Sequence, residues 1–173
     1  FSVADMMIRT QSDRMTGKNG SWHIELDGIS QETALKIAER DDVVSIGAVT
    51  IFNPDGELPY RMDGKRVVLY GIDESYLTMN STGAAEGRFP QGMGEIMLSS
   101  NAARVLQVAV GDTVTLRTPS GDWDFTVSGL GGVEESYYSG QYSLMDAYLP
   151  RTAFAALMEQ NNVHNLQTSY YVQ

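Results

Sequence analysis

The chain has 173 residues, of which 42% are hydrophobic and 20% charged, so a buried core can form and extensive disorder is excluded. Its formal net charge is -10, from 22 acidic and 12 basic residues, and this argues against nucleic acid as a partner because phosphate binding needs a cationic face. There is no cysteine, which excludes disulfides, thiol catalysis and cysteine-ligated zinc.

The ends of the chain suggest that it was cut from a longer protein. It opens on Phe1 rather than Met, and no signal-peptide pattern follows. No apolar run reaches the roughly 18 residues that read as a membrane-spanning helix. Residues 1–15 are loosely amphipathic at helical spacing, and a glycine-containing stretch at 16–20 ends that pattern.

The first half of the chain predicts a β-α-β unit. Apolar and polar residues alternate over residues 22–26, as in a half-buried strand. Ser30 can cap a following helix, and residues 43–52 are rich in β-branched side chains. The Asn-Pro-Asp-Gly sequence at 53–56 predicts a turn, and a third strand is expected at 66–70.

The middle of the chain predicts a smaller, β-rich part. Four glycines mark a connector between two lobes, namely Gly83, Gly87, Gly92 and Gly94. Beyond it we expect a strand at 95–98, a helix capped by one of the serines at 99–100, and a β-hairpin with arms at 113–117 and 123–127. The glycine run at 129–132 predicts a flexible return between the lobes.

The last part of the chain repeats the β-α-β pattern after a tyrosine-rich stretch. A strand at 147–149 leads to a helix that begins at Pro150, and residues 166–172 form a closing strand. Two β-α-β units on either side of a small β-rich insertion predict an α+β fold.

Several short motifs follow one another along the chain: Val68-Leu69-Tyr70-Gly71-Ile72-Asp73, Gly87-Arg88-Phe89-Pro90, Glu95-Ile96-Met97-Leu98-Ser99, Val110-Gly111-Asp112, Phe125-Thr126-Val127-Ser128-Gly129-Leu130 and Asp146-Ala147-Tyr148-Leu149-Pro150. No single motif is specific, but the ordered set resembles the extracytoplasmic domain of MacB-type and FtsX-like ABC transporter permeases. The resemblance covers roughly residues 22–173 and is sharpest from 66 to 130.

The resemblance implies a split β-α-β (Porter-like) lobe with an inserted small β-rich (Sabre-like) lobe. On this basis we assign residues 1–80 and 136–173 to the discontinuous Porter-like lobe, and residues 81–135 to the inserted lobe. It also implies a domain between the first two transmembrane helices of a cell-membrane protein, on the extracellular or periplasmic side.

The function implied by the resemblance is non-catalytic. Such a domain couples cytoplasmic ATP hydrolysis to conformational change and to substrate or partner handling outside the membrane, and we expect the two lobes to change their relative position. The expected partners are a second permease copy or a related permease, a cytoplasmic ATPase subunit reached through the transmembrane part, and an extracytoplasmic accessory protein.

Catalytic and metal-binding patterns are weak in this sequence. His23 and His164 lie far apart, no nucleophile elbow occurs, and acidic pairs such as Asp41-Asp42 lack the spacing of an EF-hand. We therefore assign no catalytic, cofactor-binding or metal-binding residue and expect no cofactor. A secreted ligand-binding or adhesion module and a small extracellular hydrolase stay open as alternatives.

Three tyrosines of the polar stretch are the predicted partner-contact residues: Tyr137, Tyr138 and Tyr142. A tyrosine offers a large contact area and a polar tip at low entropic cost, which suits recognition of another protein. Packing of these rings beneath their own loop is the alternative.

Overall fold

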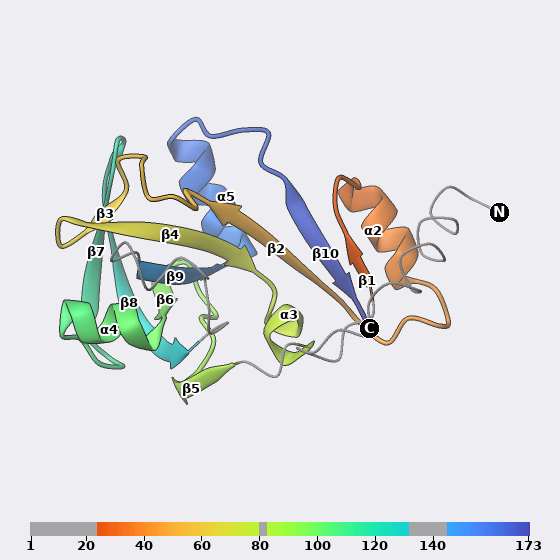
Figure 1. Cartoon of the computed structure of the whole chain (residues 1–173), viewed down its shortest axis with the longest axis horizontal. Helices are drawn as coiled ribbons and strands as arrows, with labels where there is room; N and C mark the ends of the chain where they lie inside the picture. The colour runs from red at the N-terminus through yellow and green to blue at the C-terminus, as the bar shows by residue number, and fades with distance from the viewer. Residues whose placement is uncertain (1–23, 80–82, 132–144) are drawn as a thin grey trace.

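The computed structural model describes residues 24–79, 83–131 and 145–173 (Figure 1). Strands and helices are mixed along the chain, which confirms the predicted α+β class. The elements, labelled as in Figure 1, are β1 (Ile24–Leu26), α2 (Gln31–Ala38), β2 (Ile46–Phe52), β3 (Arg61–Met62), β4 (Lys65–Ile72), α3 (Glu74–Met79), β5 (Ala84–Gly87), β6 (Glu95–Leu98), α4 (Ser100–Leu106), β7 (Thr113–Thr118), β8 (Gly121–Gly131), β9 (Met145–Pro150), α5 (Arg151–Gln160) and β10 (Thr168–Val172).

All of these strands belong to one hydrogen-bonded sheet. Their order is β1-β10-β2-β4-β3-β7-β8-β6-β9, and β9 pairs in addition with β4. Strands β4, β3, β7, β8, β6 and β9 thus close into a ring, while β2, β10 and β1 extend outward from β4. Figure 1 shows the ring at one end of the molecule and the extension, with α2 beside it, at the other.

Strand β4 connects the ring to the extension. One edge pairs in parallel with β9 along six register positions, from Val67↔Met145 to Ile72↔Pro150. The other edge is divided between two antiparallel partners, because β3 pairs with the start of β4 and β2 pairs with its second half. β4 is therefore buried along most of its length, and Val67 and Leu69 have no exposed surface.

The predicted helix caps are confirmed. The Ser30 Oγ accepts a hydrogen bond from the Thr33 N–H at the start of α2, and the Ser99 Oγ accepts one from the Ala102 N–H at the start of α4. Each hydroxyl satisfies a first-turn N–H that has no partner within its own helix.

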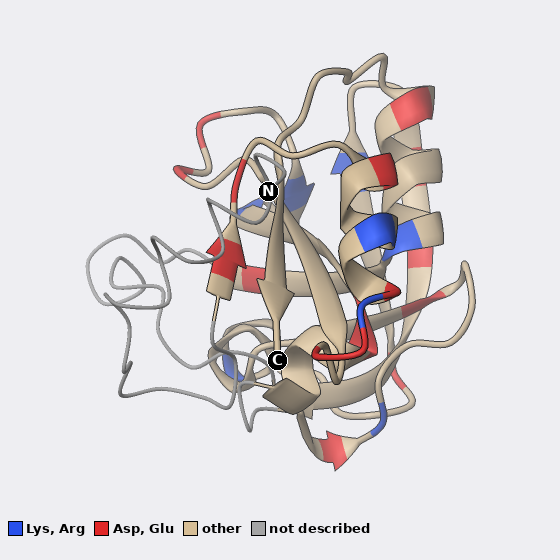
Figure 2. Cartoon of the chain, turned by 90° about the vertical axis from the view of Figure 1, so that its right-hand side faces the viewer, with Lys and Arg blue, Asp and Glu red and all other residues tan. Residues whose placement is uncertain are grey.

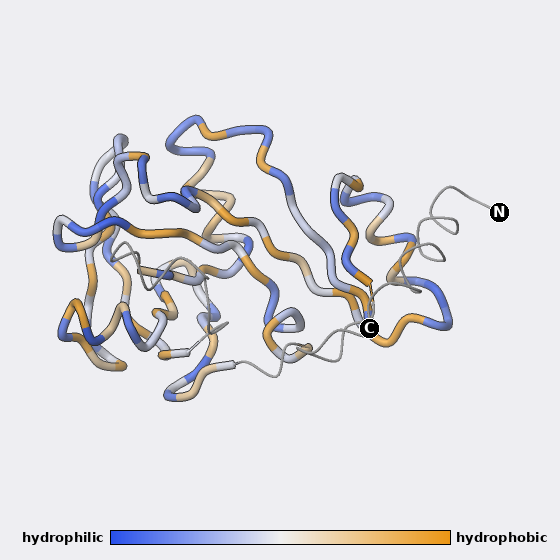
Figure 3. Tube along the Cα trace, in the orientation of Figure 1, coloured by the Kyte–Doolittle hydropathy of each residue, from blue (hydrophilic) through white to orange (hydrophobic). Residues whose placement is uncertain are grey.

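The main core fills the ring. It joins side chains from both halves of the sequence, and its most deeply buried members include Leu69, Ile96, Leu116, Phe125 and Leu157. A second, smaller core lies between α2 and the extension strands, centred on Ile37 and Tyr170. In Figure 3 the hydrophobic segments follow the strands, and the hydrophilic ones lie mainly in the connections.

The prediction of flexible connectors is wrong at residues 84–87 and 129–131. These residues form β5 and the end of β8, and the two strands pair with each other in antiparallel fashion. Their glycines serve close approach of two backbones rather than mobility, since a Cβ on Gly87 would overlap the Ser128 carbonyl and one on Gly129 would overlap the Arg88 carbonyl.

Two short elements were not predicted, α3 and β3. Strand β3 forms a tight hairpin with β4 through Asp63 and Gly64, whose φ angles of 49° and 72° are typical of a type I′ turn. An Asp-Gly pair between alternating residues is a strong hairpin signal, so the sequence did contain the information for β3.

The close approach at Gly129 predicts a large effect from one methyl group. Gly129→Ala should lower the free energy of unfolding by roughly 1–3 kcal/mol, because the added Cβ forces β8 away from the chain at Arg88. Gly94→Ala is the matched control, since a Cβ there meets open space. Urea unfolding of both variants measures the difference, and equal stability would contradict the packing described here.

Candidate functional site

The predicted partner-contact surface lies outside the part of the chain that the structure describes. Tyr137, Tyr138 and Tyr142 lie outside the described residues, and so does His23. His164 is exposed in the connection between α5 and β10, as expected for a solvated side chain.

Asp42 of the acidic pair at 41–42 forms an ion pair with Arg40. The Arg40 guanidinium donates two hydrogen bonds to the Asp42 carboxylate, of 2.9 and 3.0 Å, and Asp41 is exposed beside it. Among the described residues, no group of three or more His, Asp or Glu side chains is arranged to hold a metal ion. Figure 2 shows acidic and basic residues distributed along several segments of the ribbon.

The two ends of the described chain lie side by side. Ile24, the first residue of β1, is the register partner of Val172, the last residue of β10. Beyond β10, Gln173 exchanges backbone hydrogen bonds with Ser45, and its carbonyl also accepts from the Val44 N–H at 2.7 Å. The first and last strands that the structure describes are therefore neighbours in the sheet, near the start of β2 (Figure 1).

One face of the sheet carries tyrosines and two carboxylates. Side chains alternate along a strand, so Tyr70 of β4 and its register partner Tyr148 of β9 lie on the same face. Their rings stack with centroids 4.8 Å apart. The Tyr70 hydroxyl donates a hydrogen bond of 3.1 Å to Asp146 Oδ1, and the Asp146 residue is only 6% exposed.

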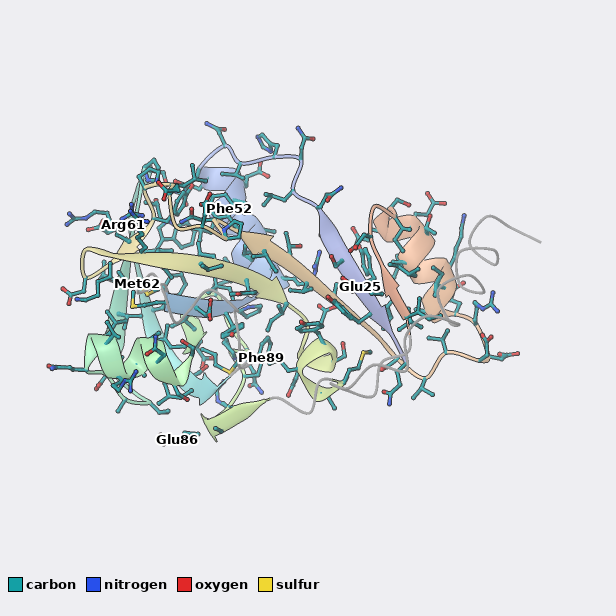
Figure 4. All side chains as sticks on the ribbon, in the orientation of Figure 1. Glu25, Phe52, Arg61, Met62, Glu86 and Phe89 are labelled. Carbon is teal, nitrogen blue, oxygen red and sulfur yellow. The ribbon has the colours of Figure 1, made fainter. Side chains whose placement is uncertain are left out.

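A second pair continues this face onto the extension. Tyr76 of α3 contacts Tyr171 of β10, with ring centroids 4.8 Å apart. The Tyr171 hydroxyl donates a 3.0 Å hydrogen bond to Glu25 Oε1 on the neighbouring strand β1. Gly47 of β2 makes room for this helix, because a Cβ there would overlap the Tyr76 backbone. Figure 4 shows Glu25 on the extension, far from Arg61 and Met62 on the ring.

Burial shifts the pKa values of the polar groups on this face. Burial, together with the nearby Asp146 carboxylate, raises the pKa of Tyr70 far above its usual value, so the phenol stays protonated and acts as a donor. Burial likewise raises the pKa of Asp146, and the hydrogen bond from Tyr70 only partly opposes this effect. The phenol pKa of Tyr171 is raised by burial and by nearby Tyr76 and Glu25.

Sequence reasoning missed this face because its pairs join distant residues. Tyr70 and Asp146 are 76 positions apart, and Tyr171 and Glu25 are 146 apart. The available signal was weak: Tyr70 ends the predicted strand at 66–70 and Asp146 directly precedes the predicted strand at 147–149, but only the parallel pairing of β4 with β9 brings them together.

The buried carboxyl of Asp146 predicts an unusual pH dependence. The folded protein binds its proton more tightly than the unfolded chain, so the stability contribution of this group is present below the unfolded pKa and is lost as pH rises through the folded pKa. Asp146→Asn keeps an oxygen for Tyr70 and removes the charge. We expect this variant to match the parent at acid pH and to exceed it in unfolding free energy at pH 7.

Asp146→Ala provides the contrast in the same denaturation series. It leaves the half-buried Tyr70 hydroxyl without its acceptor and should lose roughly 1–3 kcal/mol. A parent and an Asn variant whose stabilities stay equal from acid to neutral pH would show that Asp146 does not carry a buried charge.

Comparison with known proteins identifies the family to which this chain belongs. A family model described as MacB-like periplasmic core domain matches residues 1–173. No curated protein matches the sequence. Among the described residues, no helix has both the length and the apolar character needed to cross a membrane.

Several solved structures share the fold at low sequence identity. The periplasmic region of MacB from Actinobacillus actinomycetemcomitans aligns with a TM-score of 0.59 and 14% identity, over 86% of this chain and 66% of that one. The extracellular domain of the noncanonic ABC-type transporter YknZ from Gram-positive bacteria gives 0.58 and 15%, over 84% and 72%. A domain of a putative permease protein from Porphyromonas gingivalis gives 0.55 and 16%, over 90% and 63%. The chain thus spans about two thirds of the length of these structures.

Proposed function

Because the chain belongs to the MacB-like periplasmic core domains of ABC transporter permeases, we propose that it couples ATP hydrolysis on the cytoplasmic side to conformational change and partner handling outside the membrane. In this role the domain performs no chemistry of its own. The family is one of transporter permease domains rather than enzymes.

The observation that carries the proposal is the pairing of β1 with β10, the first and last strands that the structure describes. A domain inserted between two neighbouring membrane helices must receive the chain and return it at one edge. The pairing of Ile24 with Val172, and of Gln173 with Ser45, meets this requirement. Movement of the two helices would then act directly on β1 and β10.

We also propose that the domain divides into two lobes, residues 1–80 with 136–173 and residues 81–135. Strands β5, β6, β7 and β8 pair among themselves within the second lobe. Among the described strands, two ladders cross between the lobes, β3–β7 and β6–β9, and each has two register pairs. This division supports the description as a Porter-like lobe with a Sabre-like insertion.

The lobes nevertheless share one core. Leu69 and Leu149 of the first lobe pack in the same cluster as Ile96 and Phe125 of the second. Separating the lobes would expose this apolar surface, at about 25 cal/mol for each Å². In place of the relative lobe movement expected from the sequence, we therefore propose that the two lobes move together as one body during coupling, with no hinge between them.

The proposed partners are a second permease copy or a related permease, the cytoplasmic ATPase subunit reached through the membrane part, and an extracytoplasmic accessory protein. For contact with such a partner we propose Tyr137, Tyr138 and Tyr142. What supports them is their composition, since tyrosines suit recognition surfaces.

Removal of the domain tests the coupling role. In the full permease, residues 24–172 are replaced by a short Gly-Ser linker, which can span the gap because antiparallel register partners have Cα atoms about 5 Å apart. We expect the complex to assemble with its ATPase and hydrolyse ATP in proteoliposomes, while ATP-driven transport or partner release is lost.

A second variant in the same assay carries Tyr137→Ala, Tyr138→Ala and Tyr142→Ala. It should keep ATP hydrolysis and lose binding of the extracytoplasmic partner. Unchanged binding would remove these tyrosines from the contact surface, and full transport by the deletion variant would overturn the coupling role itself.

A disulfide between the lobes tests their movement as one body. Arg61 of β3 and Arg117 of β7 are register partners, and the chain has no cysteine of its own. The Arg61→Cys, Arg117→Cys permease should transport equally well when oxidised and when reduced. Loss of transport on oxidation, with recovery on reduction, would show instead that the lobes shift relative to each other. The two single-cysteine variants control for the loss of each arginine.

A further inference from the structure

A cavity of about 190 Å³ lies on the sheet face opposite the tyrosines. Its walls come from α2, β2 and β10, and its two charged groups come from the segments that follow β4 and β9. Pockets that hold drug-sized ligands usually measure about 300–1,000 Å³, so this cavity suits a smaller molecule.

The sheet register brings two opposite charges to the cavity. Ile72 and Pro150 are the last register partners of the parallel strands β4 and β9. Asp73 and Arg151 are the next residue of each strand, and both line the cavity. Ligands of α/β sheets commonly bind where parallel strands end, because side chains from neighbouring strands converge there.

These two charges do not satisfy each other. No ion pair joins Asp73 and Arg151 in the part of the chain that the structure describes. The Arg151 guanidinium makes one long hydrogen bond, of 3.4 Å, to Thr50 Oγ1, although it has five N–H donors. The Asp73 carboxylate accepts from the Ala48 N–H through Oδ2, and its second oxygen has no partner among the described residues.

A third polar group lines the same space. Tyr170 is only 7% exposed, yet its hydroxyl has no hydrogen-bond partner among residues 24–79, 83–131 and 145–173. A buried hydroxyl without a partner is costly, so such groups usually bind water or a ligand. The remaining walls are mostly aliphatic, formed by Ala34, Leu35, Ile46 and Ala48, and Gln31 at the start of α2 adds one amide.

We propose that this cavity binds a small zwitterion, an α-amino acid with an aliphatic side chain. Arg151 takes the carboxylate, in the two-pronged geometry that guanidinium and carboxylate groups prefer. Asp73 takes the ammonium group, Tyr170 supplies a further hydrogen bond, and the aliphatic walls receive the side chain. The site is independent of the coupling role proposed above.

Titration of this chain with L-leucine, followed by calorimetry and by amide chemical shifts, tests the site. We expect saturable binding with shifts concentrated at Ala34, Ala48 and Tyr170. 4-Methylpentanoate, which lacks the ammonium group, and isoamylamine, which lacks the carboxylate, should each bind at least about tenfold more weakly.

Three variants assign the contacts. Arg151→Gln and Asp73→Asn should each weaken leucine binding about tenfold or more, since each removes a charge-assisted contact. Tyr170→Phe should weaken it severalfold while leaving the unfolding free energy unchanged or higher, because the hydroxyl has no described protein partner to lose. Tyr60→Phe is the matched control, since this buried tyrosine lies outside the cavity.

Each possible outcome of these experiments either supports or overturns the proposed site. Absence of saturable leucine binding at tens of millimolar overturns the proposal. Equal affinity for 4-methylpentanoate, with Asp73→Asn unaffected, also overturns it and leaves a simple carboxylate site. Leucine binding that survives all three variants places the ligand elsewhere. Loss in the three variants, with the Tyr60→Phe control unchanged, supports the site as described.

Discussion

The division of one edge of β4 between two partners is the constraint on which the fold depends. β3 pairs with the start of the strand and β2 with its end, while β9 pairs along the opposite edge. The first pairing closes the ring and the second begins the extension. Gly71 lies in the half of β4 that pairs with both β2 and β9, and Phe154 of α5 occupies the space that a Cβ there would need. A larger residue there would displace α5 from the ring and from the main core.

Local features of the fold could be predicted from the sequence, because the interactions that produce them are local. The hairpin of β7 and β8 follows from alternation and a turn, and the caps at Ser30 and Ser99 follow from side chains three residues from their donors. The glycines at 87 and 129 were misjudged, since a glycine permits mobility and close backbone contact equally well. The segment that packs against the glycine decides between these two roles, and that segment lies far away in the sequence.

The polar groups of both sheet faces illustrate why sites are harder to predict than elements. Asp146 and Tyr70 meet because β9 lies parallel to β4, and Asp73 and Arg151 reach one cavity for the same reason. The β4–β9 pairing joins strands that lie far apart in the chain, with the described helices α3 and α4 between them in sequence. Parallel strands are not joined by a tight turn, so the sequence contains no turn signal that indicates the register of β4 with β9.

The pairing of β1 with β10, the first and last described strands, determines how the described fold responds to mechanical load. A pull that separates Ile24 from Val172 does not shear the β1–β10 ladder along its length. It opens the ladder from one end, so that the pairs Ile24↔Val172, Glu25↔Tyr171 and Leu26↔Tyr170 break in turn rather than together. Only one register pair then resists the pull at a time. β1 would therefore separate from β10 under tension before the ring is strained.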